Sequence, residues 1–200
     1  MVIKQSRRLN RIKESGNTVQ KLVLESEAAL VNEIYALNLL KMHSPKLIAI
    51  EGKELTLEKI KGVHLSDLTI DEDVLLWIAT GLNYIHSHKK DRKSFIHGDL
   101  HKDNILISNS VAIFLDFSCS EYSDPLEDAA AVEIHITDDP GLLKTFYSVF
   151  NTKRDRQKID RYKISHCLRH LEWAEKEGFC HLAEKSRRII KEIKDGKAKL

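Results

Sequence analysis

Residues 95–117 read FIHGDLHKDNILISNSVAIFLDF, and this stretch decides how the rest of the chain can fold. Three polar side chains stand out in it. They are Asp99, Asn104 five residues later, and Asp116 after an apolar run. Any one of them could be an ordinary polar residue in a loop. Only the spacing of all three, together with the structure expected around them, can indicate a functional site.

Two short apolar runs separate Asn104 from Asp116. Residues 105–107 and 111–115 are rich in the residue types that favour strands, and an Asn-Ser pair at 109–110 stands between them as a turn. The pattern predicts a β-hairpin. Its open end would hold Asn104 and Asp116 side by side.

The spacing of the three side chains is typical of loops that transfer a phosphoryl group. In such a loop Asp99 would accept a proton from a hydroxyl group, while Asn104 and Asp116 would hold a magnesium ion. Because the strands also fall where this motif needs them, we prefer this interpretation to three unrelated loop residues.

The segment resembles the protein-kinase-like superfamily, and its His-Gly-Asp-Leu-His wording at 97–101 is similar to aminoglycoside and choline-type phosphotransferases. It also resembles small atypical kinases, namely the RIO-like group and the kinase subunit of the KEOPS complex. The resemblance implies an α+β, bilobal fold that uses ATP and Mg²⁺. Residues 1–60 would form a reduced, β-rich N-lobe with one helix, and residues 61–200 a mainly α-helical C-lobe. Gly98 stands where regulated protein kinases carry an arginine that docks a phosphorylated loop, which implies a site that is not switched that way.

Lys21 is the candidate for holding the nucleotide's phosphates. It falls on the inward face of a predicted strand at 18–24, where a buried amine is costly unless it has a partner. The resemblance implies a lysine that contacts the α- and β-phosphates and pairs with a glutamate on the next helix. Glu33 is our candidate for that glutamate, and Glu25 and Glu27 compete with it.

The start of the chain departs from the family pattern. Gly16 is the only glycine before residue 52, so no glycine-rich loop is visible. We also expect too little room for the strand pair that usually carries such a loop. Either nucleotide affinity is weak or the turn around Gly16 caps the phosphates with backbone N–H groups. The resemblance further implies that the backbone of Glu58, Lys59 and Ile60 forms the hinge that reads the adenine edge.

Four other residues in or near the catalytic stretch have supporting roles in this interpretation. The resemblance implies that His97 is structural and hydrogen-bonds to backbone near Asp116. Lys102 either steadies the transferred phosphoryl group, whose charge develops on its equatorial oxygens, or faces solvent. Ser118 replaces the family's usual glycine, at a cost if the backbone needs a positive φ there. The resemblance implies that Asp128 ties its helix back to the catalytic loop.

The remainder of the C-lobe is predicted to be helical. We expect a long amphipathic helix at 71–88, then a charged loop. The predicted later helices are 142–151, 156–176 and 179–194, which would shape the acceptor pocket. His166 and His170 share a helical face, but the cysteines lack the paired spacing of a structural zinc site, so we predict none.

The composition and charge of the chain indicate its cellular location and its possible partners. The chain has 200 residues, 42% hydrophobic and 31% charged, which is typical of a globular protein. Its three cysteines lack paired spacing, and no apolar run approaches the roughly 20 residues of a membrane span, so we expect a cytoplasmic protein without a membrane partner. Residues 153–200 contain 15 Lys and Arg against 8 Asp and Glu. This basic tail is either a solvated helical face or a contact for a protein partner or RNA.

Together these features predict an ATP-dependent phosphotransferase with a hydroxyl acceptor, which is either a small molecule or a protein Ser/Thr. The alternative is a weakly active nucleotide-binding pseudokinase, or a scaffold subunit of a complex. Retention of Asp99 and both metal positions favours the enzyme.

Overall fold

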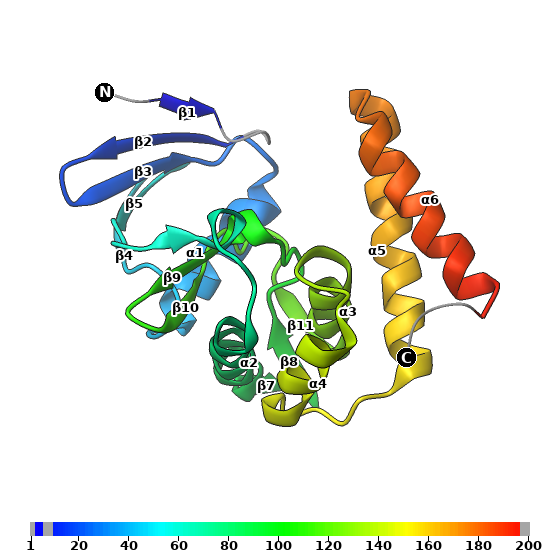
Figure 1. The fold of residues 1–200 in the computed structure, drawn as a ribbon. Coiled ribbons are helices and arrows are strands. Elements are labelled where there is room, and N and C mark those ends of the chain that lie inside the picture. The colour runs from blue at the N-terminus through cyan, green and yellow to red at the C-terminus, as the bar shows by residue number, and fades with distance from the viewer. Residues whose placement is uncertain (1–2, 6–9, 197–200) are drawn as a thin grey trace.

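A five-stranded antiparallel sheet and one helix make up the first part of the chain (Figure 1). The computed structural model describes residues 3–5 and 10–196. The strand order in this sheet is β1-β2-β3-β5-β4. The bounds are β1 Ile3–Gln5, β2 Arg11–Ser15, β3 Thr18–Leu22, α1 Glu27–Leu39, β4 Leu47–Glu51 and β5 Glu54–Glu58.

The first strand pair corrects one expectation. β1 pairs with β2 in antiparallel register, Ile3 opposite Lys13 and Gln5 opposite Arg11, so the chain does have room for a strand pair before β3. Three residues are enough to add an edge strand to a sheet. Residues 6–9, which connect the two strands in sequence, lie outside the described residues.

The second part of the chain contains two small sheets and five α-helices in the described residues (Figure 1). Their strand orders are β10-β9-β6 and β11-β8-β7. The bounds are β6 Val63–His64, the 3₁₀ turn η1 Leu65–Asp67, α2 Glu72–Ser87, β7 Lys89–Lys90, β8 Lys93–Ile96, η2 Lys102–Asn104, β9 Ile105–Ser108, β10 Val111–Phe114, β11 Glu121–Ser123, α3 Leu126–His135, α4 Pro140–Val149, α5 Arg156–Glu177 and α6 Cys180–Lys194.

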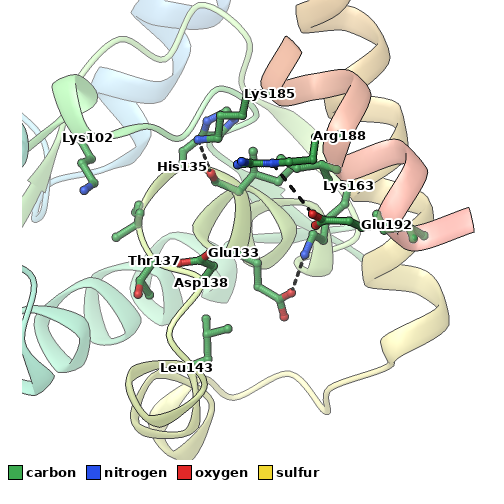
Figure 2. A pocket seen from close by; sticks show the side chains of 14 residues that line it. Lys102, Glu133, His135, Thr137, Asp138, Leu143, Lys163, Lys185, Arg188 and Glu192 are labelled. Carbon is green, nitrogen blue, oxygen red and sulfur yellow. Dashed lines mark hydrogen bonds and ion pairs between the residues drawn. The ribbon is translucent and has the colours of Figure 1, made fainter. Parts of the chain in front are cut away.

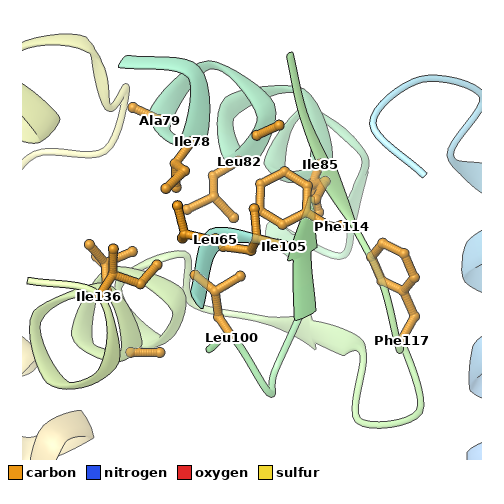
Figure 3. Close-up of a cluster of buried hydrophobic side chains, with 14 of the residues drawn as sticks. Leu65, Ile78, Ala79, Leu82, Ile85, Leu100, Ile105, Phe114, Phe117 and Ile136 are labelled. Atoms are coloured by element: carbon orange, nitrogen blue, oxygen red, sulfur yellow. The ribbon is translucent and has the colours of Figure 1, made fainter. Parts of the chain in front are cut away.

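α2 is the central helix of the hydrophobic core. It begins after Asp71, whose carboxylate accepts a hydrogen bond from the N–H of Val74 and so caps the helix. The predicted apolar stripe is fully buried, and it packs against Phe114 of β10 and the surrounding residues (Figure 3). Its members are Leu75, Ile78, Ala79, Leu82 and Ile85. At roughly 1.5–3 kcal/mol for each large apolar side chain, this stripe fixes the hairpin that carries the site.

The prediction of a charged loop after α2 is wrong. Residues 89–96 form the hairpin β7–β8, closed by Asp91 at φ +48° and Arg92 at φ +65°. Two consecutive positive φ values match the turn that best follows the twist of a hairpin. β8 also pairs with β11, so a strand on each side of the catalytic stretch holds it in place.

The last three helices follow the predicted ranges closely. Gly178 adopts φ +77° between α5 and α6 and accepts the left-handed cap conformation without a Cβ clash. α5 and α6 form an antiparallel pair, and α5 lies beside α3 (Figure 1). The boundary predicted at residue 60 falls between β5 and β6, and no element crosses it.

Candidate active site

The hairpin β9–β10 positions Asn104 as predicted. Its turn holds Asn109 and Ser110 at φ +49° and +62°, and the N–H of Leu115 donates to the carbonyl of Asn104 over 2.9 Å. Asn104 is buried, and its Nδ2 donates to the carbonyl of Asp99 over 2.9 Å. This bond fixes the amide and leaves its oxygen for another partner.

Lys21 joins the sheet, α1 and the end of the hairpin. Its Nζ lies 3.0 Å from Glu33 Oε1 and 3.0 Å from Asp116 Oδ1. Lys21 is 5% exposed and Glu33 is 1% exposed. Glu33 lies on the buried face of α1, and the competitors Glu25 and Glu27 form no ion pair with Lys21 among the described residues.

The charges of this group depend on one another. Burial alone would lower the pKa of Lys21, but the carboxylates of Glu33 and Asp116 raise it overall, so the amine stays protonated. Burial alone would raise the pKa of Asp116, but Lys21 lowers it, so Asp116 stays ionised. Burial raises the pKa of Glu33 despite the nearby ammonium, so the ionised carboxylate of Asp116 is the group that would attract a divalent cation.

The donor set fits a magnesium ion. Mg²⁺ prefers oxygen ligands and is usually held by one or two protein groups together with substrate phosphates. The carboxylate of Asp116 and the free amide oxygen of Asn104 supply such oxygens. Oδ1 of Asp116 is buried and meets Lys21 without forming a well-aligned hydrogen bond. In the described ranges, no cluster of three or more His, Cys, Asp or Glu side chains could hold a metal by itself.

Asp128 in the first turn of α3 holds the loop before Asp99. Its carboxylate accepts hydrogen bonds from the N–H of His97 over 2.8 Å, the N–H of Gly98 over 3.0 Å and Nε2 of His86 over 2.9 Å. Burial alone would raise its pKa, but His86 and the other donors lower it overall. The expected tie between helix and loop is present, and His86 of α2 is its third partner.

His97 and Gly98 shape the loop itself. Nε2 of His97 donates to the carbonyl of Leu115 over 2.9 Å, just before Asp116, as expected for a structural histidine. Gly98 has φ +81°, and a Cβ there would lie 2.2 Å from the carbonyl oxygen of Cys119. A side chain as large as arginine has no place at residue 98 in this conformation.

The segment after the hairpin carries a left-handed residue, but at an unexpected position. Asp116 adopts φ +62°, whereas Ser118 does not have a positive φ, so serine replaces glycine there without that cost. Left-handed backbone costs a non-glycine residue about 1 kcal/mol or more, and such strain often occurs at functional sites. Asn32 of α1 holds the segment by donating from Nδ2 to the carbonyl of Ser118 over 3.1 Å. No sequence signal distinguished Asn32 beforehand.

The residues predicted to form the hinge line a pocket at the end of β5. A pocket of about 390 Å³ is lined by Asn17, Glu58, Lys59, Ile60, Lys61 and Ser108. The N–H of Glu58 donates to Lys46 and that of Lys59 donates to Asn17, so neither is available to a base. Among the described residues no acceptor bonds to the N–H of Ile60, which is left as the donor of the three.

Lys102 lies at the edge of a larger pocket. This pocket of about 620 Å³ lies between the catalytic loop, the end of α3 and the helices α5 and α6 (Figure 2). Lys102 extends into it from η2, three residues after Asp99, with its side chain partly exposed. The Lys102 side chain is therefore neither fully exposed to solvent nor buried.

Comparison with known proteins gives the family context. Residues 54–147 match the model of the phosphotransferase enzyme family. Over 94% of its length the chain superposes on choline kinase LicA from Streptococcus pneumoniae, covering 91% of that chain with a TM-score of 0.74 and 16% identity. It superposes equally well on the GDP complex of aminoglycoside 2′-phosphotransferase-IIIa, with a TM-score of 0.74, 13% identity, and coverage of 97% and 92%. The bilobal kinase-like fold that the catalytic stretch implied is therefore confirmed.

Sequence relatives point to a second group. The chain is 28% identical to the EKC/KEOPS complex subunit BUD32 of Enterocytozoon bieneusi over 76% of each protein. It is 27% identical over 59% of its own length to a probable bifunctional tRNA threonylcarbamoyladenosine biosynthesis protein of Methanothermobacter thermautotrophicus. The match spans only 21% of that relative's length. None of the described helices is long and apolar enough to cross a bilayer.

Proposed function

We propose that this kinase-like chain is an ATP- and Mg²⁺-dependent phosphotransferase that moves the γ-phosphoryl group to a hydroxyl acceptor. The single observation that carries the proposal is the buried contact of Lys21 with both Glu33 and Asp116, each at 3.0 Å. A buried ammonium between two carboxylates is costly to build, and it is useful where a phosphate chain and a divalent cation meet.

The N-lobe residues would bind the nucleotide. Lys21 would contact the α- and β-phosphates, and Glu33 would hold the amine in place. The carbonyl of Glu58 and the N–H of Ile60 would bind the adenine edge. Lys59 would only connect the two, because its N–H donates to Asn17 and its side chain pairs with Glu14 over 2.7 Å. AMP and GDP complexes of structural neighbours support a nucleotide in this cleft.

The C-lobe residues would carry out the transfer. Asp99 would accept the proton of the acceptor hydroxyl as its oxygen bonds to the γ-phosphorus and the bond from phosphorus to the β-phosphate oxygen breaks, releasing ADP. Asn104 and Asp116 would hold Mg²⁺, which neutralises charge on the phosphates when bound. Lys102 would steady the equatorial oxygens. Catalysis would rest mainly on positioning and electrostatics.

The test compares Asp99→Asn with a matched neighbour, Asp103→Asn. The Asp103 side chain is 76% exposed and lies outside the proposed machinery. We expect Asp99→Asn to reduce phosphoryl transfer by about 10²–10⁴-fold, since general-base catalysis contributes that much, while ATP still raises the melting temperature. Asp103→Asn should keep transfer within about twofold. Equal activity of the Asp99→Asn variant and the unmodified protein would refute the proposed base.

A second candidate is a nucleotide-binding subunit of a larger complex, through the KEOPS-named relative and the basic C-terminal helices. Its partner would be a protein or an RNA. This candidate predicts phosphate release without any acceptor, or ATP binding without turnover. Phosphate release measured with and without a panel of hydroxyl compounds separates the two, because the phosphotransferase needs the acceptor.

A further inference from the structure

The larger pocket beside Lys102 is lined by charged side chains of both signs. Its lining carries four basic side chains, from Lys102, Lys163, Lys185 and Arg188, and three acidic ones, from Glu133, Asp138 and Glu192. Their pairing decides which charges a ligand would meet.

The basic side chains around Glu133 neutralise it. Lys163 lies 3.1 Å, Arg156 3.0 Å and Arg154 3.3 Å from its carboxylate oxygens, and the Glu133 side chain is only 2% exposed. Burial alone would raise the pKa of Glu133, but these cations lower it overall. Glu133 therefore contributes little negative charge to the open space of the pocket.

Two lysines remain available to a ligand. Lys102 extends from the catalytic loop, and Lys185 approaches from α6 on the other side of the pocket (Figure 2). In the part of the chain that the structure describes, neither amine forms an ion pair; Lys185 donates to the carbonyl of Ile134 over 3.0 Å. Burial is the main cause that lowers the pKa of Lys185; Arg188 and Lys102 lower it further, whereas Cys167 and the pocket residue Asp138 act in the opposite direction.

Two other polar side chains of the pocket lining could also bind an anionic ligand. Arg188 and Glu192 form only a loose, exposed pair with 3.9 Å between Nε and Oε1, which leaves the guanidinium able to turn. Nε2 of His135 is buried and has no hydrogen-bond partner among the described residues. Burial lowers the pKa of His135 to about 2, so its imidazole is neutral and could donate one hydrogen bond to a ligand oxygen.

The size of the pocket limits its occupant. A volume of about 620 Å³ suits a small molecule, and Leu143, Ile189 and Ile193 add apolar surface. A cationic acceptor such as choline or an aminoglycoside would meet Lys102 and Lys185 with repulsion, although solved neighbours of this fold are named for such acceptors.

We propose that this pocket binds the phosphoryl acceptor, and that the acceptor is a small hydroxyl compound that already carries a phosphate or carboxylate group. The anionic group would lie between Lys185 and Arg188, with its hydroxyl directed toward Asp99 past Lys102. This inference rests on the proposed phosphotransferase function and specifies its substrate class.

The test uses matched pairs of compounds that differ in one anionic group. Ribose 5-phosphate is compared with ribose, and glycerate with glycerol, while choline and kanamycin represent cationic acceptors. Binding is measured by calorimetry with Mg²⁺ and a non-hydrolysable ATP analogue present, so that phosphate compounds do not enter the nucleotide site. At least one anionic member should bind about tenfold or more tightly than its neutral partner.

The variants locate the site. Lys185→Gln and Arg188→Gln should each weaken the anionic compound by about tenfold, since each removes a charge-assisted hydrogen bond. Lys191→Gln is the matched control, because Lys191 is exposed on the same helix but lies outside the pocket. It should change affinity by less than about twofold.

Several results would overturn the proposal. Equal binding of the anionic and neutral partners, preference for choline or kanamycin, or equal losses in Lys185→Gln and Lys191→Gln would each do so. Failure of the proposed function looks different, because the nucleotide analogue would then bind in no sample, or ATP would bind without any phosphoryl transfer to the compounds. In that case the same comparisons without nucleotide still decide whether the pocket binds anions.

Discussion

Replacing Asp128 by alanine is the sharpest test of how the catalytic loop is held. The carboxylate accepts three hydrogen bonds: Oδ2 from the N–H of His97 and from Nε2 of His86, and Oδ1 from the N–H of Gly98. Asp128 is 1% exposed, so water cannot replace these bonds. Asp128→Ala leaves two backbone N–H groups and an imidazole without an acceptor.

The magnitude follows from these contacts. A hydrogen bond to a charged group contributes about 1.5–3 kcal/mol, and each buried donor left without a partner costs about 1–3 kcal/mol. Allowing for partial relaxation, we expect Asp128→Ala to lower the free energy of unfolding by about 4 kcal/mol, which is about 10 °C in melting temperature for a chain of this size. Asp128→Asn should cost about 2 kcal/mol, because one of its two acceptor positions becomes a donor.

The pH dependence gives a second measure of the same residue. The folded pKa of Asp128 is lowered, so its contribution to stability is present above the unfolded value of about 3.9 and is lost as pH falls through the folded pKa. Stability of the unmodified protein should therefore fall more steeply in acid than that of Asp128→Asn.

Urea unfolding and calorimetry measure these changes, with Asp103→Ala as the control on the exposed side of the loop. The reasoning is refuted if the free energies of unfolding of Asp128→Ala and that control differ by less than about 1 kcal/mol, because the loss of three buried hydrogen bonds to a carboxylate should cost more than that.

Three further predictions concern Lys21, Gly98 and Glu133. Lys21→Met should abolish the rise in melting temperature caused by Mg²⁺ and ATP, and should destabilise the free protein by about 3–5 kcal/mol, since Glu33 stays buried without its cation; an unchanged shift with ATP in a thermal melt would contradict this. Gly98→Ala should cost at least about 1–2 kcal/mol in urea unfolding and reduce phosphoryl transfer, because its Cβ would meet the carbonyl of Cys119 in a left-handed backbone, and a variant with normal kcat would speak against that conformation. Glu133→Gln should be less stable than the unmodified protein at pH 7 and lose less stability toward pH 3, because the lowered pKa of Glu133 gives stability only while it is ionised; parallel pH profiles would count against the cation cluster.

The hairpin that carries Asn104 could be predicted because its information is local. Two apolar runs of strand-forming residues around a two-residue turn specify antiparallel pairing within about ten residues of chain. The stripe of α2 and the end of α5 at Gly178 were predictable for the same reason, since helical period and a glycine cap lie within a few residues of each other.

Short, charged strands escaped prediction. Lysines form all of β7 and begin β8, so the sequence lacks the alternation of apolar and polar residues by which a half-buried strand is recognised. β1 has only three residues, and it is a strand because β2 offers it a partner. In both cases pairing with a neighbour, and not intrinsic preference, decides the conformation.

By itself, the sequence determined the hairpin, the helices and the types of side chain available to a phosphoryl-transfer site. Tertiary structure alone decided that Glu33, and not Glu25 or Glu27, lies against Lys21, and that Asn32 holds the segment after Asp116. It also decided that lysines from a loop and from the last helix face one pocket. The physical reason is that these partners lie far apart along the chain, so only the packing of the helices and sheets, which responds to the whole core at once, sets the distances between them.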